Sequence, residues 1–417
     1  MSEFNEKYAV LVTIAESTSM LDECERSLAE LERLLNTAGG ECFAKIIQVK
    51  DKFDPRTCIG KGKVEEIAEL CKNNELSLVV FDFELTPAQI RNLENDIGDV
   101  TVIDRSMLIL DIFALHAVSG EGKLQVELAQ LKYSAPRLTG KGIELSRQGG
   151  GIGSRGPGES KLETDRRHLH EKIVSLEKKL AELEHNRAVM RAQRDRSGLT
   201  KVALVGYTNA GKSTLLNKMT GADVLAEDKL FATLDPTTRK MELETGESIL
   251  LTDTVGFIRK LPHHLVKAFK STLDEVVYAD ILLIVSDVND PEVQEHLEVT
   301  RSVIEELGAA DKPIIYVYNK CDLSEGTSYA IASDNSVCLS AYRGDGIDML
   351  LEMIIAEIGK GKKECDLTIP YSEQYALNQL YNLYNVVSVD YLDEGISVKV
   401  VLDQKGRGQY AKYFKEG

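Results

Sequence analysis

Short apolar runs alternate with amphipathic stretches over the first hundred residues of the chain. The apolar runs predict strands at 8–15, 42–49, 76–83 and 100–104. Between them, leucine and isoleucine recur every three or four residues, which is the period of an α-helix. These stretches predict helices at 20–37, 55–74 (after a turn) and 86–98. Thr86 suits the capping position of the last helix, and Pro87 suits its first turn. Strands that alternate with helices predict a small parallel α/β subdomain over residues 1–104.

Helical periodicity takes over in residues 105–198. The stretches 105–133 and 160–196 are both amphipathic, and the second repeats its apolar residues at intervals of three, four or seven. That spacing is typical of a coiled coil, and two such helices joined by one loop predict an antiparallel hairpin. The joining segment, 134–159, has no predicted secondary structure of its own. A loop of this length is either functional or disordered.

The alternation of strands and helices returns in residues 199–360, which predict a doubly wound, mostly parallel sheet. The apolar runs lie at 202–206, 248–251, 279–288 and 313–318, and residues 261–277 predict a helix. Residues 361–417 contain one amphipathic helix and then two strand-like runs on either side of the turn Asp393-Glu394-Gly395. They predict a small α/β carboxy-terminal domain. The fold class is therefore α/β, with a helical hairpin between the first and second sheets.

Composition and charge exclude several classes of protein. A chain of 417 residues exceeds a single core, and its net charge of −17 argues against a general coat for nucleic acid. No apolar run approaches the roughly 20 residues of a membrane-spanning helix. The acidic start MSEFNEKYAV runs straight into a strand, unlike a signal peptide. The seven cysteines show neither C-x-x-C spacing nor a zinc-type cluster. These features predict a cytoplasmic protein with reduced thiols.

The strongest chemical signal follows the strand at 202–206. There the chain reads Gly206-Tyr207-Thr208-Asn209-Ala210-Gly211-Lys212-Ser213-Thr214 and then begins a helix, which is the phosphate-binding loop G-x-x-x-x-G-K-S in its proper context. The two glycines let the backbone wrap closely round a phosphate, and successive N–H groups attract the anion. Lys212 can reach the β- and γ-phosphates, and the Ser213 hydroxyl can ligate Mg²⁺.

Three later motifs, each after a predicted strand, indicate that the nucleotide is GTP. Asp253-Thr254-Val255-Gly256 places a carboxylate near the Mg²⁺ shell, where it would act through water, and the Gly256 N–H can sense the γ-phosphate. In Asn319-Lys320-Cys321-Asp322, the Asp322 carboxylate can accept hydrogen bonds from N1–H and the 2-amino group of guanine, which adenine cannot offer. In Ser340-Ala341-Tyr342, a backbone amide can meet guanine O6. Four such motifs in order predict a GTPase domain at 199–360.

The segment DKLFATLDPTTRK (228–240) lies between the first two motifs and is the predicted switch that orders around Mg²⁺ and the γ-phosphate. Thr233, Thr237 and Thr238 are all candidates for the threonine that ligates Mg²⁺. Their spacing alone does not choose among them.

The loop at 134–159 has an unusual composition. Most of it lies within residues 141–201, which contain 14 lysines or arginines and nine aspartates or glutamates, a net charge of +5. Because the whole chain has a net charge of −17, the remaining residues carry −22. Six glycines between 149 and 158 permit almost any backbone path. Such a segment can thread a narrow, phosphate-lined space and order on arrival, whereas a flexible linker is the alternative. The candidate contacts to this anionic partner are Arg137, Lys141, Arg147 and Arg155.

These motifs together resemble the HflX family of ribosome-associated GTPases. The segment GGGIGSRGPGESKLETDRR (149–167) is similar to that family's signature between its amino-terminal and GTPase domains. PRTCIGKGKVEEI (55–67) and FATLDPTTR (231–239) are also similar to its patterns. The resemblance extends over residues 7–360, and part of the family has a short carboxy-terminal domain as well.

The resemblance implies a partner and an activity. The partner would be the large ribosomal subunit and its ribosomal RNA, with the loop of the hairpin near the peptidyl-transferase region. The activity would be GTP-dependent separation of stalled or idle ribosomes into subunits, often under stress. The threonine that ligates Mg²⁺ would be Thr233. The GTP site would also include the residues around it, so that this part of the site comprises Phe231, Ala232, Thr233, Leu234 and Asp235.

Three positions depart from the wider GTPase pattern. Many GTPases carry a water-orienting glutamine after the glycine of D-x-x-G, but this chain has Phe257, so intrinsic hydrolysis is expected to be slow and stimulated by the ribosome. Asn209 stands where potassium-activated GTPases coordinate K⁺, which would do the electrostatic work of an arginine finger, although asparagine also suits a tight turn. Tyr342 stands where many GTPases have lysine.

Two functions remain open at the level of the sequence. The chain is either a monomeric factor that splits ribosomes, or a slow GTP-gated checkpoint that occupies the large subunit during assembly or dormancy without splitting anything. A third possibility, a signalling switch that acts on another protein, leaves the basic loop unexplained.

Overall fold

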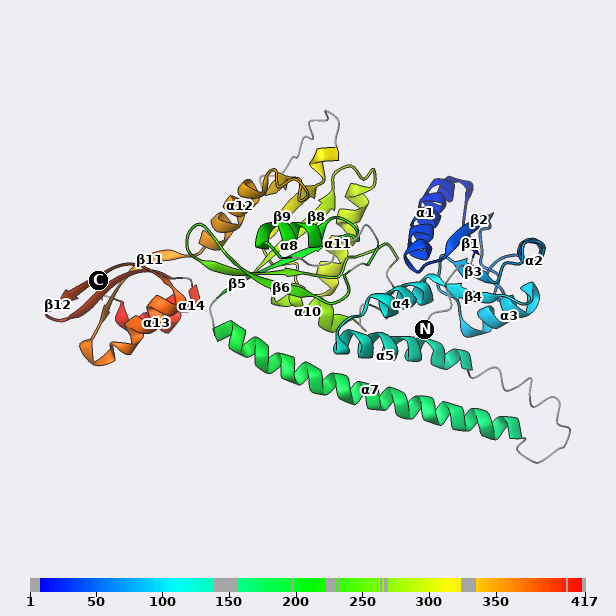
Figure 1. Cartoon of the computed structure of the whole chain (residues 1–417), viewed down its shortest axis with the longest axis horizontal. Helices are drawn as coiled ribbons and strands as arrows, with labels where there is room; N and C mark the ends of the chain where they lie inside the picture. Colours follow the sequence, from blue (N-terminus) through cyan, green and yellow to red (C-terminus); the bar gives the residue numbers. More distant parts are fainter. Residues whose placement is uncertain are drawn as a thin grey trace. The chain divides into compact units, whose positions relative to one another are not determined.

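The computed structural model describes residues 8–138, 157–196, 199–222, 230–231, 233–260, 262, 265, 269–323, 335–402 and 404–414. The chain divides into two compact units, and Figure 1 labels most of their elements. The first comprises Met1–Glu184, Glu227–Asp235 and Lys260–Ser271, and the second comprises His185–Ala226, Pro236–Arg259 and Thr272–Gly417. Two stretches of the predicted GTPase domain therefore fold with the first unit.

The first unit contains a parallel four-stranded sheet in the order β2-β1-β3-β4, as predicted (Figure 1). Its strands are β1 (Tyr8–Ala15), β2 (Glu41–Val49), β3 (Leu78–Phe81) and β4 (Thr101–Asp104). The helices between them are α1 (Leu21–Thr37), α2 (Lys61–Asn73) and α3 (Pro87–Ile97). Thr86 caps α3 as expected, because its side chain accepts the Gln89 N–H and the Gln89 side chain accepts the Thr86 N–H.

The two central strands are apolar on both faces because helices cover the sheet on both sides. All four residues of β3 are buried, as are seven of the eight residues of β1. On one face, apolar residues of α2 and α3 pack against the sheet, including Val64, Ile67, Ile90 and Leu93. On the other face, α1 buries Leu28, Leu31, Leu34 and Leu35.

A buried ion cluster lies at the carboxyl ends of β3 and β4. Arg105 begins α4 (Arg105–His116) and is only 2% exposed, and its guanidinium donates to Asp82 at 2.7 Å and to Glu30. Asp82 also accepts hydrogen bonds from Ser27 Oγ at 2.6 Å and from Lys260 Nζ at 2.7 Å. Burial alone would raise the pKa of Asp82, but the charges of Arg105 and Lys260 hold this pKa below its ordinary value.

The predicted hairpin consists of α5 (Gly120–Leu138) and α7 (Pro157–Arg196), and α7 returns along α5 (Figure 1). Two ion pairs join them, Lys132–Glu177 and Lys172–Glu127, both at 2.7 Å. The predicted loop bounds of 134–159 are wrong at both ends, because α5 continues to Leu138 and α7 begins at Pro157, a residue suited to a first helical turn. Arg137 is in the last turn of α5, whereas Lys141, Arg147 and Arg155 lie outside the described residues.

The second unit contains a six-stranded sheet in the order β10-β9-β8-β5-β7-β6, in which only β6 is antiparallel to its neighbour (Figure 1). Its strands are β5 (Thr200–Gly206), β6 (Thr237–Glu242), β7 (Ser248–Asp253), β8 (Ile281–Asp287), β9 (Ile314–Asn319) and β10 (Ser336–Cys338). Its helices include α8 (Lys212–Thr220), α10 (Lys270–Tyr278), α11 (Val293–Glu306) and α12 (Ile347–Gly359). This is the predicted doubly wound, mostly parallel architecture.

Two details of this region differ from the prediction. The end of the predicted switch forms the edge strand β6, which places Thr237 and Thr238 in a ladder with β7. The Thr238 hydroxyl lies 3.0 Å from the Thr252 hydroxyl. The sequence predicts a helix at 261–277, and the structure describes α10 over Lys270–Tyr278. Most of the residues from 261 to 268 lie outside the described part of the chain.

The carboxy-terminal residues of the second unit form an antiparallel sheet in the order β11-β13-β12. Its strands are β11 (Lys363–Ile369), β12 (Asn385–Leu392) and β13 (Gly395–Leu402), and helices α13 (Tyr375–Leu383) and α14 (Gln404–Gln409) complete the small α/β domain. The predicted turn joins β12 to β13, and its Gly395 is required because a Cβ there would lie 2.8 Å from the Ile369 carbonyl oxygen.

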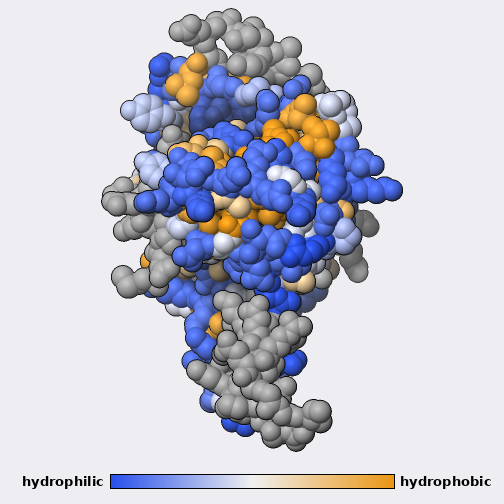
Figure 2. All heavy atoms as spheres, turned by 90° about the vertical axis from the view of Figure 1, so that its right-hand side faces the viewer, coloured by the Kyte–Doolittle hydropathy of each residue, from blue (hydrophilic) through white to orange (hydrophobic). Residues whose placement is uncertain are grey.

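Figure 2 shows a face on which hydrophilic side chains predominate and apolar ones form small areas. Among the helices of the described residues, none combines the length and the apolar character that crossing a membrane requires.

Replacing Arg105 by alanine is expected to destabilise the first unit by about 3–5 kcal/mol, because the cation that the buried Glu30 and Asp82 share is removed. Native-state hydrogen exchange at the β3 amides measures this loss, since β3 lies directly before Asp82. The matched control is Arg56→Ala, which removes an exposed pair with Asp96 and should change the exchange little. Equal losses in the two variants would contradict a structural role for the buried cluster.

Candidate nucleotide site

The phosphate loop is built at the carboxyl end of β5, and two of its residues must be glycine. Gly206 has φ +146°, and a Cβ there would lie 2.1 Å from the carbonyl oxygen of Val285 on β8. Gly211 has φ +92°, and a Cβ there would lie 2.2 Å from Nδ2 of Asn319. Any side chain at either position would separate the loop from the neighbouring strands. The structure thus explains both glycines of the motif.

Lys212 occupies the interior of this loop. Its side chain is buried, and Nζ donates to the carbonyl oxygens of Tyr207 at 2.8 Å and Gly206 at 3.2 Å. Burial lowers the pKa of Lys212 to about 8, although the nearby Asp253 carboxylate opposes the shift. A phosphate in the loop would give the ammonium an anionic partner in place of neutral carbonyls.

Two of the predicted Mg²⁺ residues are brought together. The Ser213 hydroxyl, at the start of α8, donates to Asp253 Oδ2 at 2.5 Å, and Asp253 is fully buried at the end of β7. A hydroxyl beside a carboxylate is a donor set that suits Mg²⁺, which prefers oxygen ligands and is usually shared with nucleotide phosphates. The next residue, Thr254, is also buried and donates its hydroxyl to the Leu204 carbonyl oxygen at 2.7 Å. The arrangement of these side chains fits the ion.

The D-x-x-G motif lies directly against the phosphate loop. The Phe257 N–H donates to the Gly206 carbonyl at 3.0 Å, and the Thr208 N–H donates to the Phe257 carbonyl at 2.8 Å. Gly256 allows this approach, since a Cβ there would lie 2.7 Å from the Thr208 Cα and 3.0 Å from Lys212 Nζ. The Phe257 side chain is fully buried, so it packs in the core and is not available to orient water.

A second anchor beyond Phe257 was missed by sequence reasoning. The Tyr207 ring stacks on His296 of α11, with centroids 3.6 Å apart, and its hydroxyl accepts the Arg259 N–H at 2.8 Å. The Arg259 guanidinium pairs with Glu292 at 2.9 Å and with Glu295 at 2.5 Å. The chain after the D-x-x-G motif is therefore fixed to both the phosphate loop and α11. Tyr207 and Arg259 carry no motif signal that could have indicated this.

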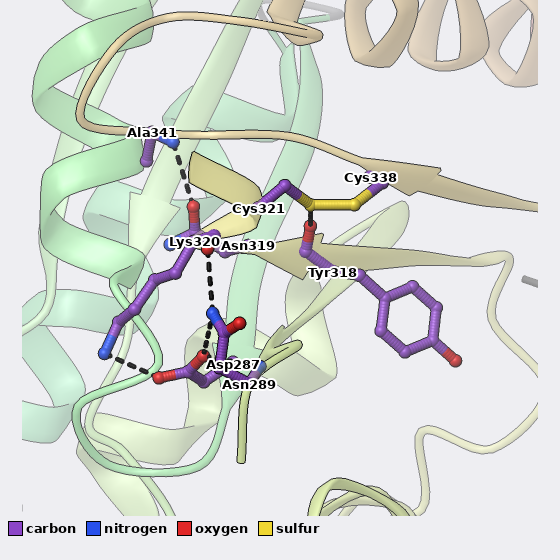
Figure 3. The surroundings of a disulfide bond; sticks show 8 residues. All are labelled: Asp287, Asn289, Tyr318, Asn319, Lys320, Cys321, Cys338 and Ala341. Atoms are coloured by element: carbon purple, nitrogen blue, oxygen red, sulfur yellow. Dashed lines mark hydrogen bonds and ion pairs between the residues drawn. A yellow bond between two sulfur atoms is a disulfide. The ribbon is translucent and has the colours of Figure 1, made fainter. Parts of the chain in front are cut away.

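The base-recognition motifs are joined by Asn319, which is buried. Its Nδ2 donates to the Ala210 carbonyl of the phosphate loop at 2.9 Å, and its Oδ1 accepts the Ala341 N–H at 2.9 Å. Lys320 pairs with Asp287 at 2.9 Å, and Asn289 Nδ2 donates to the Lys320 carbonyl at 2.8 Å (Figure 3). The four predicted motifs thus meet in one region of the second unit.

The other members of the predicted base motifs differ in exposure. The Asp322 side chain is 10% exposed, and one of its oxygens lies 3.9 Å from Arg343 Nε. Ser340 is buried, and its Oγ accepts the Arg343 N–H at 3.1 Å, whereas Tyr342 is 81% exposed. The Tyr342 ring is therefore mainly in contact with solvent.

One prediction about the cysteines is wrong. Cys321 and Cys338 form a disulfide, with Cα atoms 6.4 Å apart, in place of the two reduced thiols expected from the scattered spacing (Figure 3). The two residues are 17 positions apart in the chain, and adjacent strands bring them together. The other five cysteines, all in the described part of the chain, are free thiols as predicted.

The predicted GTP-site residues Phe231, Leu234 and Asp235 belong to the first unit. The Phe231 ring packs edge-on against Phe113 of α4, with centroids 4.8 Å apart, and Leu234 is buried. The Asp235 carboxylate caps α5, since it accepts the backbone N–H groups of Val118 at 3.0 Å and Ser119 at 2.8 Å. Ala232 lies outside the described residues, and Thr233 is half-buried. Their contact with nucleotide stays a prediction.

At about pH 9, nucleotide binding is expected to take up close to one proton per molecule. In the free protein the lowered pKa leaves Lys212 mostly neutral at that pH, and the phosphates of the ligand favour its charged form. Calorimetric titration with GDP in two buffers of different ionisation enthalpy measures the uptake. Lys212→Arg is the control, because guanidinium stays charged and should show none. Zero uptake by the unaltered protein would contradict the buried, largely neutral Lys212.

Comparison with known proteins places these units in one family. Residues 25–114 match the family model described as GTP-binding GTPase N-terminal, residues 116–194 match GTP-binding GTPase Middle Region, and residues 201–320 match 50S ribosome-binding GTPase. A crystal structure of a GTP-binding protein from Sulfolobus solfataricus in complex with GDP covers 85% of this chain and 99% of its own, with 25% identity and a TM-score of 0.43.

Two curated relatives carry the same family name. GTPase HflX of Caldanaerobacter subterraneus subsp. tengcongensis is 51% identical over 393 residues, which cover 94% of this chain and 90% of the relative. GTPase HflX of Escherichia coli is 44% identical over 385 residues, which cover 91% of this chain and 90% of the relative. Because three consecutive family models and two near-full-length relatives agree, the chain belongs to the HflX family of GTPases.

Proposed function

We propose that this GTPase binds the large ribosomal subunit in the cytoplasm and uses its GTP cycle to separate stalled or idle ribosomes into subunits. The observation that carries the proposal is the long hairpin of α5 and α7, whose joining segment holds the basic, glycine-rich sequence. The match of residues 201–320 to a ribosome-binding GTPase model supports the same partner.

The hairpin is suited to deliver a loop into a narrow space. At about 1.5 Å per residue, the 40 residues of α7 extend roughly 60 Å. Val126 and Ala129 of α5 and Leu176 of α7 are buried, and the ion pairs between the helices add to this apolar contact. A rigid support of this kind would hold the cations of the joining segment at the end of the hairpin, where phosphates of ribosomal RNA could order them.

Mg²⁺ would be held by the Ser213 and Thr233 hydroxyls, with Asp253 acting through water. When bound, the ion neutralises developing charge on the β- and γ-phosphates. The protein's own part is to orient these oxygens. Asp253 is fixed by its place at the end of β7, and Ser213 by the first turn of α8.

A slow checkpoint that occupies the large subunit without splitting ribosomes is the second candidate. The buried Phe257 side chain favours it, because a site without a water-orienting glutamine at this position should hydrolyse GTP slowly unless another group is supplied. The two candidates differ in whether intact ribosomes are consumed.

Intact ribosomes mixed with the protein and GTP are expected to yield free subunits on a sucrose gradient. A non-hydrolysable GTP analogue should give the same result and GDP should not, because binding of the triphosphate state supplies the energy and hydrolysis resets the factor. Co-sedimentation with the large subunit while intact ribosomes persist would support the checkpoint and contradict splitting.

The same gradient tests the loop. The double variant Arg147→Ala/Arg155→Ala should weaken ribosome binding roughly tenfold, and should reduce the slope of log affinity against log salt by about two. The matched control Lys360→Ala/Lys363→Ala removes two exposed lysines of the second unit and should change neither quantity. If the loop variant instead lost GDP affinity, the loop would belong to the nucleotide site.

We also propose that K⁺ binds at Asn209 beside the phosphates. Asn209 has φ +61°, a left-handed backbone conformation that asparagine adopts more readily than most residues. The turn alone can therefore account for asparagine at this position, even if no ion binds. If the ion is present, GTP hydrolysis in K⁺ should exceed hydrolysis in Na⁺ on the order of tenfold at equal ionic strength, because K⁺ supplies positive charge to the transition state. Equal rates would remove K⁺ and leave the turn as the reason for Asn209.

A further inference from the structure

The base-recognition region carries the disulfide of the chain's described residues. Cys321 is the third residue of the motif that begins at Asn319, and Cys338 ends β10, two residues before Ser340. The bond therefore joins the two segments that are predicted to meet guanine (Figure 3). Its position in the site is the reason to ask what oxidation does to nucleotide binding.

The disulfide reinforces contacts that already hold these segments together. The Cys321 N–H donates to the Leu339 carbonyl at 3.2 Å, and the Ala341 N–H donates to Asn319 Oδ1 at 2.9 Å. The Cys321 sulfur also lies 3.3 Å from the Tyr318 carbonyl oxygen, and only a reduced thiol can donate a hydrogen bond there. Breaking the sulfur–sulfur bond would therefore leave the segments folded, with a weaker connection between them.

Exposure separates this pair from four of the other five cysteines. Cys321 and Cys338 are both half-buried, so a small oxidant can reach them. Cys24, Cys58, Cys71 and Cys365 are buried, whereas Cys42 is half-buried like the pair. Burial raises the pKa of the Cys24, Cys42 and Cys71 thiols, and it raises the pKa of Cys58 to about 11, so little of the reactive thiolate forms.

We propose that Cys321 and Cys338 are a reversible oxidation site at which a hydroperoxide slows the release of guanine nucleotide. The disulfide holds both base-recognition segments in the arrangement that fits the base, and reduction lets them separate more readily. The inference rests on the proposed function of Asp322, Ser340 and Ala341 as the guanine site. Disulfides of cytoplasmic proteins are usually transient and regulatory, which is consistent with this role.

The chemistry balances with a hydroperoxide as the oxidant. One thiolate attacks a peroxide oxygen, the O–O bond breaks, and a sulfenic acid forms as hydroxide or alkoxide leaves and takes up a proton. The second thiolate attacks the sulfenic sulfur, the S–S bond forms, and the S–O bond breaks to release water after protonation. In sum, two thiols and hydrogen peroxide give a disulfide and two waters, and two electrons pass from sulfur to peroxide. A dithiol reverses the reaction through a mixed disulfide.

The expected effect follows from preorganisation. Guanine binding requires two segments to hold one arrangement, and a covalent link reduces the conformational freedom that the free site loses on binding. Because the contacts to the nucleotide stay the same in both redox states, we expect a slower release rate and not a change of base preference.

The test is the release of fluorescent GDP from the full chain in Mg²⁺, after treatment with hydrogen peroxide or with dithiothreitol. Release should be roughly fivefold slower from the oxidised protein, as expected for a modestly preorganised site. Cys338→Ser should release GDP at the fast rate under both conditions, and so should Cys321→Ser. The matched control Cys365→Ser, a buried free thiol in the carboxy-terminal domain, should keep the redox difference.

Mass spectrometry of non-reduced peptides reports the bond itself. Equal release rates in samples that contain the Cys321–Cys338 bond would overturn the proposal, and failure of peroxide to form the bond would overturn it as well. A separate measurement, GDP affinity of Asp322→Ala, tests the guanine site. If that variant loses affinity while redox state has no effect, the oxidation site is wrong and the guanine site stands. If affinity is unchanged in both redox states, the proposed guanine site is wrong.

Discussion

The nucleotide site depends on one buried amide. Asn319 donates to the Ala210 carbonyl of the phosphate loop and accepts from the Ala341 N–H, and so it sets the spacing between the part that would bind phosphates and the part that would bind the base. Gly211 lacks a side chain because the same amide occupies the space where its Cβ would be. Each hydrogen bond is worth about 1 kcal/mol on average, but leaving either buried partner unsatisfied would cost more.

The charges around this amide are arranged for an anion. Lys212 is held by neutral carbonyls inside a buried loop, and Asp253 is buried beside the Ser213 hydroxyl. Buried charges are costly, and a nucleotide with its metal ion would supply both signs of charge at once. The segment after the D-x-x-G motif is anchored separately, because its Arg259 pairs with Glu292 and Glu295 at the start of α11. The site thus combines a fixed scaffold with charges that suit an anion and its metal ion.

Features governed by local rules could be predicted from the sequence, and those governed by tertiary contact could not. The strands of the first unit follow from apolar runs, the start of α3 follows from Thr86, and the glycines of the phosphate loop follow from backbone geometry. β6 was missed because an exposed edge strand of sequence TTRKME has no apolar face to reveal it. The Tyr207–His296 stack and the Cys321–Cys338 bond join positions distant in the chain, and neither spacing nor composition encodes such pairs.

The division of the chain into units has a consequence for any shortened form of the protein. Phe231 and Phe269 pack on Phe113 of α4, Asp235 caps α5, and Lys260 pairs with Asp82. A fragment cut at the sequence boundary near residue 199 would keep these side chains and lose Phe113, α5 and Asp82. Two aromatic contacts, a helix cap and an ion pair would then be lost together. Each of the two units is discontinuous in sequence, so a single cut in the chain cannot separate one unit from the other intact.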